Sequence, residues 1–238
     1  MKKQIEDYNF TQGEIILIDK PQGQTSHQVV QIIKKKLGAR KVGHAGTLDP
    51  LATGLLVILV NKATKLSDFF LNKDKVYEVE AQLFIETDTG DITGDIIKQE
   101  KNKNFELKQI KQVLVSFNNN EYWQNPPLYS AIKVKGQKLY QYARKGLTVE
   151  VPARLVKISR LELLEYISQS GTIKLLVNCS KGTYIRSLVK DIAQKLGTIA
   201  TVKQLRRISS GKLHIQQAVS LEAADQAPII TLTDLKKL

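Results

Sequence analysis

The sequence has few of the residues that several classes of protein depend on. Its one cysteine, Cys179, can form no internal disulfide, so we expect a reducing compartment and no cysteine metal site. The three histidines, His27, His44 and His214, lack the spacing of metal ligands. The longest apolar run, residues 55–60, is far too short to span a membrane, and the N-terminus lacks the apolar core of a signal peptide. We therefore expect a cytoplasmic protein.

Negative charge is also scarce. The chain has 36 lysines and arginines against 23 acidic residues, which gives a formal net charge of +13. An excess of this size attracts polyanions, of which nucleic acid is the usual one. The cations form three basic groups: first Lys34, Lys35, Lys36, Arg40 and Lys41; second Lys133, Lys135 and Lys138; third Lys203, Arg206 and Arg207.

Hydrophobic periodicity predicts a mixture of strands and helices. The expected strands are residues 15–18, 55–60, 77–85, 173–179 and one or two strands within 149–166. The expected helices are 64–71, 105–117, 185–196 and a segment that Ser26 caps and Gly38 ends. No strand–helix unit repeats, so we predict an α+β fold in one large domain or two small ones, not a doubly wound sheet.

Residues 44–54, H-A-G-T-L-D-P-L-A-T-G, hold a single carboxylate, Asp49. Gly46, Pro50 and Gly54 interrupt regular structure, and the residue before a proline is disfavoured in helical geometry. We therefore expect Asp49 to project from a turn or an extended segment. Taken alone, the Asp-Pro pair is also typical of an Asx-turn or a helix cap.

Two other segments stand out. Residues 125–144 interleave tyrosines with cations, a pattern that suits a single-stranded or looped RNA but also a surface loop leading into a helix. Residues 86–95 are rich in acids, yet their spacing differs from a calcium-binding EF-hand, so we expect a solvated turn. The sequence has no P-loop and no nucleophile elbow.

Six motifs, spread in order from about residue 13 to residue 221, carry a resemblance to a known family. They are I-L-I-D-K-P-Q-G-Q-T-S-H, V-G-H-A-G-T-L-D-P-L-A-T-G-L-L, K-V-Y-E-V-E, P-P-L-Y-S-A-I-K-V-K-G-Q-K-L-Y-Q-Y-A-R-K-G, C-S-K-G-T-Y-I-R-S-L and L-R-R-I-S-S-G. Together they closely resemble the TruB family of tRNA pseudouridine-55 synthases. The resemblance implies the pseudouridine-synthase core, a mixed and largely antiparallel sheet flanked by helices, and an enzyme without cofactor or metal.

The resemblance also implies a catalytic set. Asp49 is expected to act as nucleophile at C1′ of the uridine or as base at C2′, and the sequence does not choose between these routes. Arg186 should pair with Asp49 and favour its ionised form. Tyr77 should stack on the uracil and is the candidate base for the C5 proton.

Other residues are expected to support the site. Tyr184 should pack beneath it, and Leu205 should form an apolar pocket wall. Lys20 and Pro21 should support the catalytic loop. His44 should fill the space in the T-loop that the uridine leaves when it flips out, a step that the chemistry requires.

The segment 123–150 is expected to close over the T-arm of tRNA, with Lys135 and Arg144 as phosphate contacts. The expected domain boundaries are an N-terminal extension at 1–12, a catalytic domain at 13–221 and a short C-terminal tail at 222–238 in place of a full RNA-binding domain. We expect a monomer that needs no guide RNA and contacts no membrane.

Two alternatives remain open at this point. One is an RNA-guided synthase of the same superfamily that modifies ribosomal RNA with protein partners. The other is a non-catalytic factor that binds the T-arm and helps tRNA to fold. The presence of Asp49, Tyr77 and Arg186 together favours an enzyme.

Overall fold

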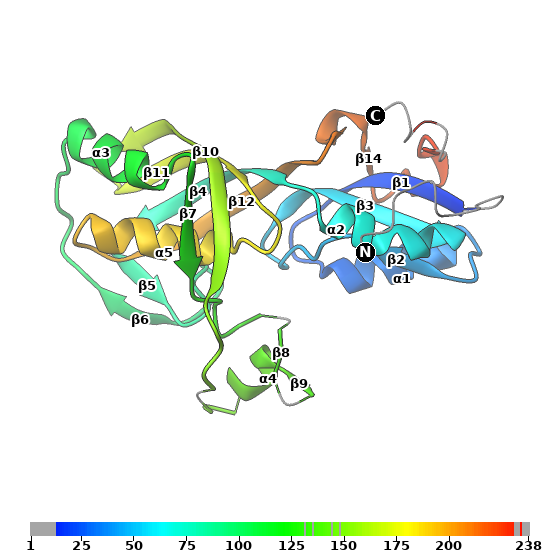
Figure 1. The fold of residues 1–238 in the computed structure, drawn as a ribbon, viewed down its shortest axis with the longest axis horizontal. Coiled ribbons are helices and arrows are strands. Elements are labelled where there is room, and N and C mark those ends of the chain that lie inside the picture. The colour runs from blue at the N-terminus through cyan, green and yellow to red at the C-terminus, as the bar shows by residue number, and fades with distance from the viewer. Residues whose placement is uncertain are drawn as a thin grey trace. The chain divides into compact units, whose positions relative to one another are not determined.

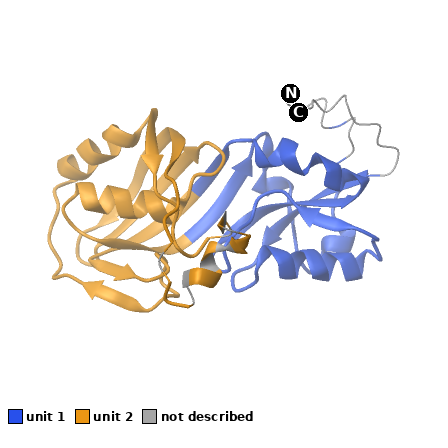
Figure 2. Cartoon of the chain, turned by 60° about the horizontal axis from the view of Figure 1, so that its bottom comes forward, with its two compact units in different colours: residues 1–77, 205–238 blue, residues 78–204 orange. Residues whose placement is uncertain are grey.

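A computed structural model of the chain shows two compact units, residues 1–77 with 205–238 (unit 1) and residues 78–204 (unit 2) (Figure 2). Strands β4 (Lys75–Leu83) and β12 (Ala200–Ser210) each contribute residues to both units. The structure describes residues 13–130, 132–134, 136–143, 145–147, 149–230 and 234.

Unit 1 is built on strands β1 (Gly13–Lys20) and β3 (Thr53–Asn61), which pair antiparallel and bury almost continuous apolar runs. The unit 1 part of β12 pairs parallel with β3. The sheet is completed by β2 (Val42–His44), β13 (Leu213–His214) and β14 (Val219–Ser220). The helical segments are α1 (Ser26–Lys36), η2 (Lys62–Leu66), α2 (Ser67–Leu71), η3 (Ile215–Gln217) and η4 (Ala224–Gln226).

Unit 2 has the strand order β12-β4-β11-β10-β7, in which β11 is Thr172–Cys179, β10 is Arg154–Ile167 and β7 is Asn120–Gln124. Helices α3 (Leu107–Phe117) and α5 (Ile185–Lys195) belong to this unit, together with a hairpin of β5 (Ile85–Thr87) and β6 (Ile96–Gln99) (Figure 1). Helix α5 buries most of its residues, because its apolar side chains recur with the helical period.

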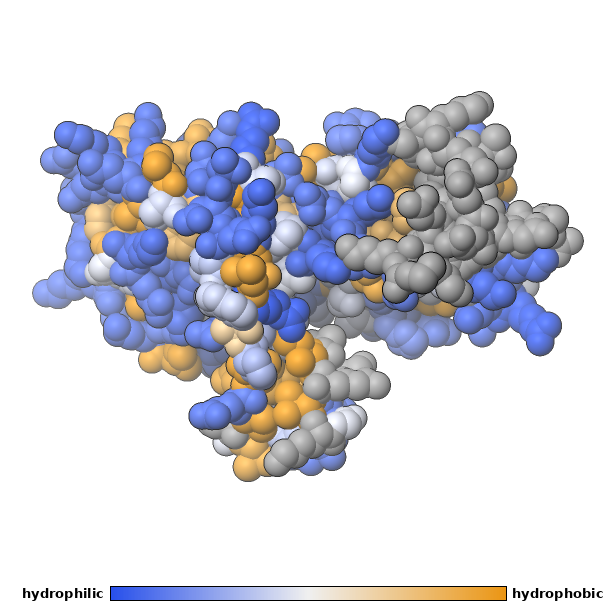
Figure 3. All heavy atoms as spheres, viewed as in Figure 1, coloured by the Kyte–Doolittle hydropathy of each residue, from blue (hydrophilic) through white to orange (hydrophobic). Residues whose placement is uncertain are grey.

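A small lobe projects from unit 2 between β7 and β10 (Figure 1). It contains β8 (Lys133–Val134), β9 (Gln137–Lys138) and α4 (Leu139–Ala143). Apolar residues gather on its visible face, whereas most of the visible surface of the rest of unit 2 is hydrophilic (Figure 3).

The predicted α+β class, with a mixed and mostly antiparallel sheet flanked by helices, is confirmed. The expected strand at 77–85 ends earlier, because Phe84 has a positive φ of 70° that separates β4 from β5. Residues 154–167 form one strand. Sequence reasoning did not predict β12. Among the described residues, no helix is both long enough and apolar enough to cross a membrane.

Candidate active site

Asp49 lies in the loop of unit 1 that connects β2 to β3, and its side chain is half-buried. The Asp49 carbonyl accepts a hydrogen bond from the Ala52 N–H at 3.0 Å. Residues 49–52 therefore form a β-turn with Pro50 in its second position, where a proline fixes the required φ. The expectation that Asp49 lies in a turn is confirmed.

Lys20, at the end of β1, is the first anchor of this loop. Its side chain is fully buried, and Nζ donates to the carbonyls of Pro21 at 2.8 Å, Gln24 at 2.7 Å and Pro50 at 3.5 Å. The Gly23 N–H also donates to the Pro50 carbonyl, at 2.8 Å. The carbonyl of Pro50, the residue after Asp49, thus accepts from two donors, Lys20 Nζ at the end of β1 and the Gly23 N–H in the turn that follows.

Burial disfavours the charged ammonium and lowers the pKa of Lys20 to about 8. The Asp49 charge acts in the opposite direction and the Arg207 charge lowers the pKa further. Lys20 is therefore close enough to Asp49 for the two charges to interact.

Ser26 is the second anchor. Its hydroxyl accepts a hydrogen bond from the Leu48 N–H at 2.8 Å and donates to the Leu48 carbonyl at 3.0 Å. The prediction that Ser26 caps α1 is wrong. Thr25 is the N-cap and forms a capping box with Gln28, which leaves the Ser26 hydroxyl to fix the residue before Asp49.

Arg207, on β12, is the third anchor and has only 1% of its surface exposed. Its Nε donates to the Leu55 carbonyl at 2.7 Å and its Nη2 to the Gly46 carbonyl at 3.1 Å. Gly54 has φ 99°, and a Cβ there would lie 2.3 Å from the Arg207 carbonyl oxygen. A Cβ on Gly46, where φ is 104°, would lie 3.2 Å from Arg207 Nη1. Gly46 in the loop and Gly54 at the start of β3 thus leave room for Arg207.

The cations of the third basic group already have partners within the protein. Arg207 is buried, and Arg206 makes a bidentate ion pair with Asp19 at 3.0 and 2.7 Å. Lys203 pairs with Glu80 at 2.8 Å. These three cations lie on β12, where successive side chains face opposite sides of the sheet, and their partners are distant in the chain. The sequence alone therefore did not reveal the partners.

His44 ends β2, directly before the loop. Its Nδ1 is buried and has no hydrogen-bond partner among the residues that the structure describes. Burial, and then the charges of Arg207 and His27, lower the pKa of His44. The imidazole is therefore neutral at neutral pH.

Two further predicted residues of unit 1 lie on strands. Tyr77 on β4 and Leu205 on β12 each have 9% of their surface exposed. Tyr77 follows the alternation of β4, in which the next residue, Glu78, faces solvent.

In unit 2, Arg186 lies in the first turn of α5 and is 7% exposed. Its Nη1 donates to the Thr89 carbonyl at 2.7 Å and its Nη2 to the Tyr129 carbonyl at 2.8 Å. The guanidinium is thus held by backbone groups from two separate segments.

The acidic segment 86–95 supplies one of these carbonyls. It is a turn, as predicted, and Thr93 and Asp95 are solvent-exposed, but the segment is solvated only in part. Thr87 and Asp91 are buried. The Thr87 hydroxyl donates to the Asp91 carbonyl at 2.7 Å and contacts the Thr201 hydroxyl at 2.8 Å. The segment is a packed turn that orients Arg186.

Tyr184 is the N-cap residue of α5 and is held by Gln124, whose side chain is fully buried. Gln124 Oε1 accepts from the Tyr184 N–H at 2.8 Å, and Nε2 donates to the Tyr184 carbonyl at 3.2 Å. Nε2 also lies 2.6 Å from the Tyr122 hydroxyl, which donates to Asp191 at 3.0 Å. Burial raises the pKa of Asp191. This network fixes the start of the helix that carries Arg186.

Comparison with known proteins shows the family of the chain. Residues 34–185 match the family model described as TruB family pseudouridylate synthase, N-terminal domain. The chain belongs to the TruB family. Residues 186–237 match the model described as tRNA pseudouridylate synthase B C-terminal domain.

Curated TruB relatives cover most of the chain. A tRNA pseudouridine synthase B from Mesoplasma florum is 48% identical over 94% of this chain and 78% of its own length. One from Endomicrobium trichonymphae is 42% identical over 98% of both chains. Among solved structures, a chain of a Cbf5-Nop10-Gar1 complex superposes with a TM-score of 0.69 at 31% identity, over 94% of this chain and 56% of that one. The chain thus spans about half the length of this structural neighbour.

Within unit 1 of this TruB-family chain, Lys20, Pro21 and His44 gather around the Asp49 loop. Within unit 2, Tyr184 and Arg186 share the start of α5. Lys135 and Arg144 lie outside the described residues. The catalytic and binding roles of all these residues, and the domain boundaries, stay predictions.

Sequence reasoning missed three residues that organise the site: Ser26 and Arg207 as loop anchors, and Gln124. Each bonds backbone groups, so no charged partner marked it. Two signals were available: Ser26 and Arg207 lie within the quoted motifs, and Gly46 and Gly54 allow a close approach.

Proposed function

We propose that this chain isomerises uridine 55 in the T-loop of tRNA to pseudouridine. Membership of the TruB family and relatives named tRNA pseudouridine synthase B support this proposal. The observation that carries it is the single carboxylate, Asp49, at the centre of a loop anchored from β1, α1 and β12.

The reaction breaks the N1–C1′ bond, turns the uracil and joins C5 to C1′. The proton on C5 is lost and N1 gains one, so no atom is added and no electron is transferred. An ionised Asp49 serves both possible routes, attack on C1′ or removal of the C2′ proton. The positive charge of Lys20 interacts with Asp49 and favours the ionised form.

The anchored loop suits this chemistry because the carboxylate must keep its place while the detached uracil turns. Holding a reactive group in position can contribute several kcal/mol to lowering a barrier, roughly 7–11 in well-oriented cases. Water would compete for C1′, so the site must also exclude it.

The remaining residues take the roles that the family resemblance implies. Tyr77 stacks on the uracil and accepts the C5 proton, and Arg186 pairs with Asp49. His44 replaces the flipped uridine in the T-loop, a place suited to a neutral, planar ring. The protein acts alone in the cytoplasm, as a monomer without guide RNA.

The test is incubation of unmodified tRNA transcript with wild-type protein and with Asp49→Asn, followed by chemical mapping of pseudouridine. Wild type should modify position 55 without guide RNA. Asp49→Asn keeps the shape but removes the anionic oxygen, so turnover should fall at least about a thousandfold. Binding should persist, because phosphate contacts dominate affinity.

Asp68→Asn is the matched control, since Asp68 is an exposed carboxylate of the same unit and should leave turnover unchanged. Modification by wild type at a different uridine would refute the T-loop assignment. Turnover of Asp49→Asn close to that of Asp68→Asn would refute the role of Asp49.

A further inference from the structure

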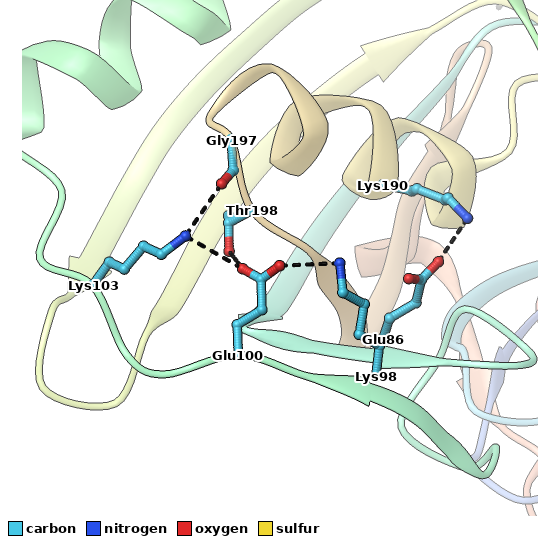
Figure 4. Close-up of polar contacts among 7 residues, drawn as sticks. All are labelled: Glu86, Lys98, Glu100, Lys103, Lys190, Gly197 and Thr198. Atoms are coloured by element: carbon cyan, nitrogen blue, oxygen red, sulfur yellow. Dashed lines mark hydrogen bonds and ion pairs between the residues drawn. The ribbon is translucent and has the colours of Figure 1, made fainter.

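Among the residues that the structure describes, some lysines and arginines form ion pairs with acidic residues of the protein, and others do not. In unit 2, Lys190 pairs with Glu86 at 2.7 Å, and Lys98 and Lys103 pair with Glu100 at 3.2 and 3.6 Å (Figure 4). The third basic group is buried or paired, as described above. These cations therefore already have partners within the protein itself.

The first basic group differs. Lys34 and Lys35 at the end of α1, and Arg40 and Lys41 before β2, are exposed, and we call these four residues the α1 surface. Their side chains make no hydrogen bond or ion pair with any residue that the structure describes. Only their neighbour Lys36 is engaged, donating to the Glu222 carbonyl and lying 3.7 Å from Asp225.

The acidic residues that lie near the end of α1, Glu222 and Asp225, belong to the C-terminal part of unit 1 and are next to Lys36. Residues 20–48, from the end of β1 to the loop of Asp49, include no aspartate or glutamate. Favourable interaction with the helix dipole can account for lysines in the last turn of α1. It cannot account for Arg40 and Lys41, which follow Gly38, where a φ of 58° ends the helix.

The α1 surface is also joined directly to the site. Lys41 immediately precedes β2, and β2 leads into the loop that holds Asp49. With a rise of roughly 3.3 Å per residue, this three-residue strand spans about 10 Å. Lys41 is eight residues before Asp49 and therefore lies at most about 29 Å from it. An RNA with its uridine at Asp49 can thus bring backbone phosphates of other nucleotides to this surface.

We propose that the α1 surface binds backbone phosphates of the RNA substrate at nucleotides other than the uridine that is modified. This inference rests on the proposed function and adds the surface that positions the RNA. Contacts of this kind set the position and orientation of the RNA but do not read its sequence.

The experiment measures the affinity of the full-length protein for a T-arm hairpin transcript across a salt series. The variants are Lys34→Gln/Lys35→Gln and Arg40→Gln/Lys41→Gln. Log affinity falls linearly with log salt, and each phosphate contact contributes about 0.7–0.9 to the steepness of that fall. The fall should therefore be less steep by about 1.5 in each double variant than in wild type. Affinity at about 0.1 M salt should fall roughly tenfold, and the modified base should stay the same.

The matched control is Lys108→Gln/Lys111→Gln, which removes two exposed lysines from α3 of unit 2. This control should change the salt dependence of the affinity by much less than either α1-surface variant. Equal slopes in wild type and both α1-surface variants, or an equal loss in the control, would overturn the inference. If wild type binds the hairpin but forms no pseudouridine, the proposed function fails while the slopes still test the α1 surface.

Discussion

Replacing Arg207 with methionine tests whether a buried cation organises the loop that carries Asp49. Methionine preserves much of the unbranched apolar stem but removes the charge and every donor. Two backbone carbonyls, those of Gly46 and Leu55, then lose the donors that now lie at 3.1 and 2.7 Å. Because Arg207 is 1% exposed, water cannot readily replace those donors.

The magnitude follows from these contacts. An unsatisfied buried carbonyl costs about 1–3 kcal/mol, and removing a buried charge recovers part of that loss. We therefore expect the free energy of unfolding to fall by about 3 kcal/mol. For a chain of this size, 1 kcal/mol corresponds to roughly 2–4 °C in Tm, so Arg207→Met should melt about 6–12 °C lower.

Arg206→Met is the matched control, because it changes the neighbouring arginine of the same strand. The Arg206 side chain is 39% exposed and pairs with Asp19 at the surface. Such pairs contribute about 0–1 kcal/mol, so the Tm should fall by less than about 4 °C.

The assay combines thermal unfolding with single-turnover pseudouridine formation well below both melting temperatures. Arg207→Met should be slow even where it is fully folded, since the Asp49 loop has lost an anchor. Equal Tm values for the two variants would refute the stabilising role of the buried bonds. A lowered Tm of Arg207→Met together with a wild-type rate of pseudouridine formation would show that Arg207 stabilises the fold but does not position the Asp49 loop.

Two other predictions concern Lys20 and Gln124. The three carbonyls around Lys20 match the three donors of a charged ammonium, which deprotonation would disrupt. The rate of pseudouridine formation by wild type should therefore fall as pH rises through the Lys20 pKa of about 8. Lys20→Met should show no such fall. Free lysine titrates near 10.5, so the unfolded chain binds more protons between these pH values. The contribution of Lys20 to the free energy of unfolding should therefore rise over that window, and chemical denaturation of wild type against Lys20→Met checks this. Gln124→Met removes both bonds to Tyr184 and should lower Tm and rate more than Tyr122→Phe, which leaves those bonds in place.

Much of the fold could be predicted because its signals are local. The apolar run at 55–60 and the helical period of 185–196 each bury their side chains as expected. The turn at Asp49 followed from the proline after it. In each case the neighbouring residues in sequence determine the backbone conformation.

The strand β12 could not be recognised in the same way, because cations interrupt its apolar alternation. Arg206 and Arg207 are adjacent and chemically identical, yet one is paired at the surface and the other is buried. Successive residues of a strand face opposite sides of the sheet, so the two arginines meet different surroundings once β12 pairs with Thr53 and Gly54 of β3, more than 150 positions away in the chain. Pairing over such a separation has no local signature.

The anchors of the Asp49 loop show why such a site is hard to read from sequence. Lys20, Ser26 and Arg207 come from β1, α1 and β12, and each bonds backbone atoms, which every residue possesses. Their attachment points, residues 46, 48 and 50, lie on both sides of Asp49. The loop is therefore positioned without using the Asp49 carboxylate in these bonds. A rigid loop of this kind is organised when the protein folds, before RNA binds, which is the arrangement that a carboxylate acting on a turning uracil requires.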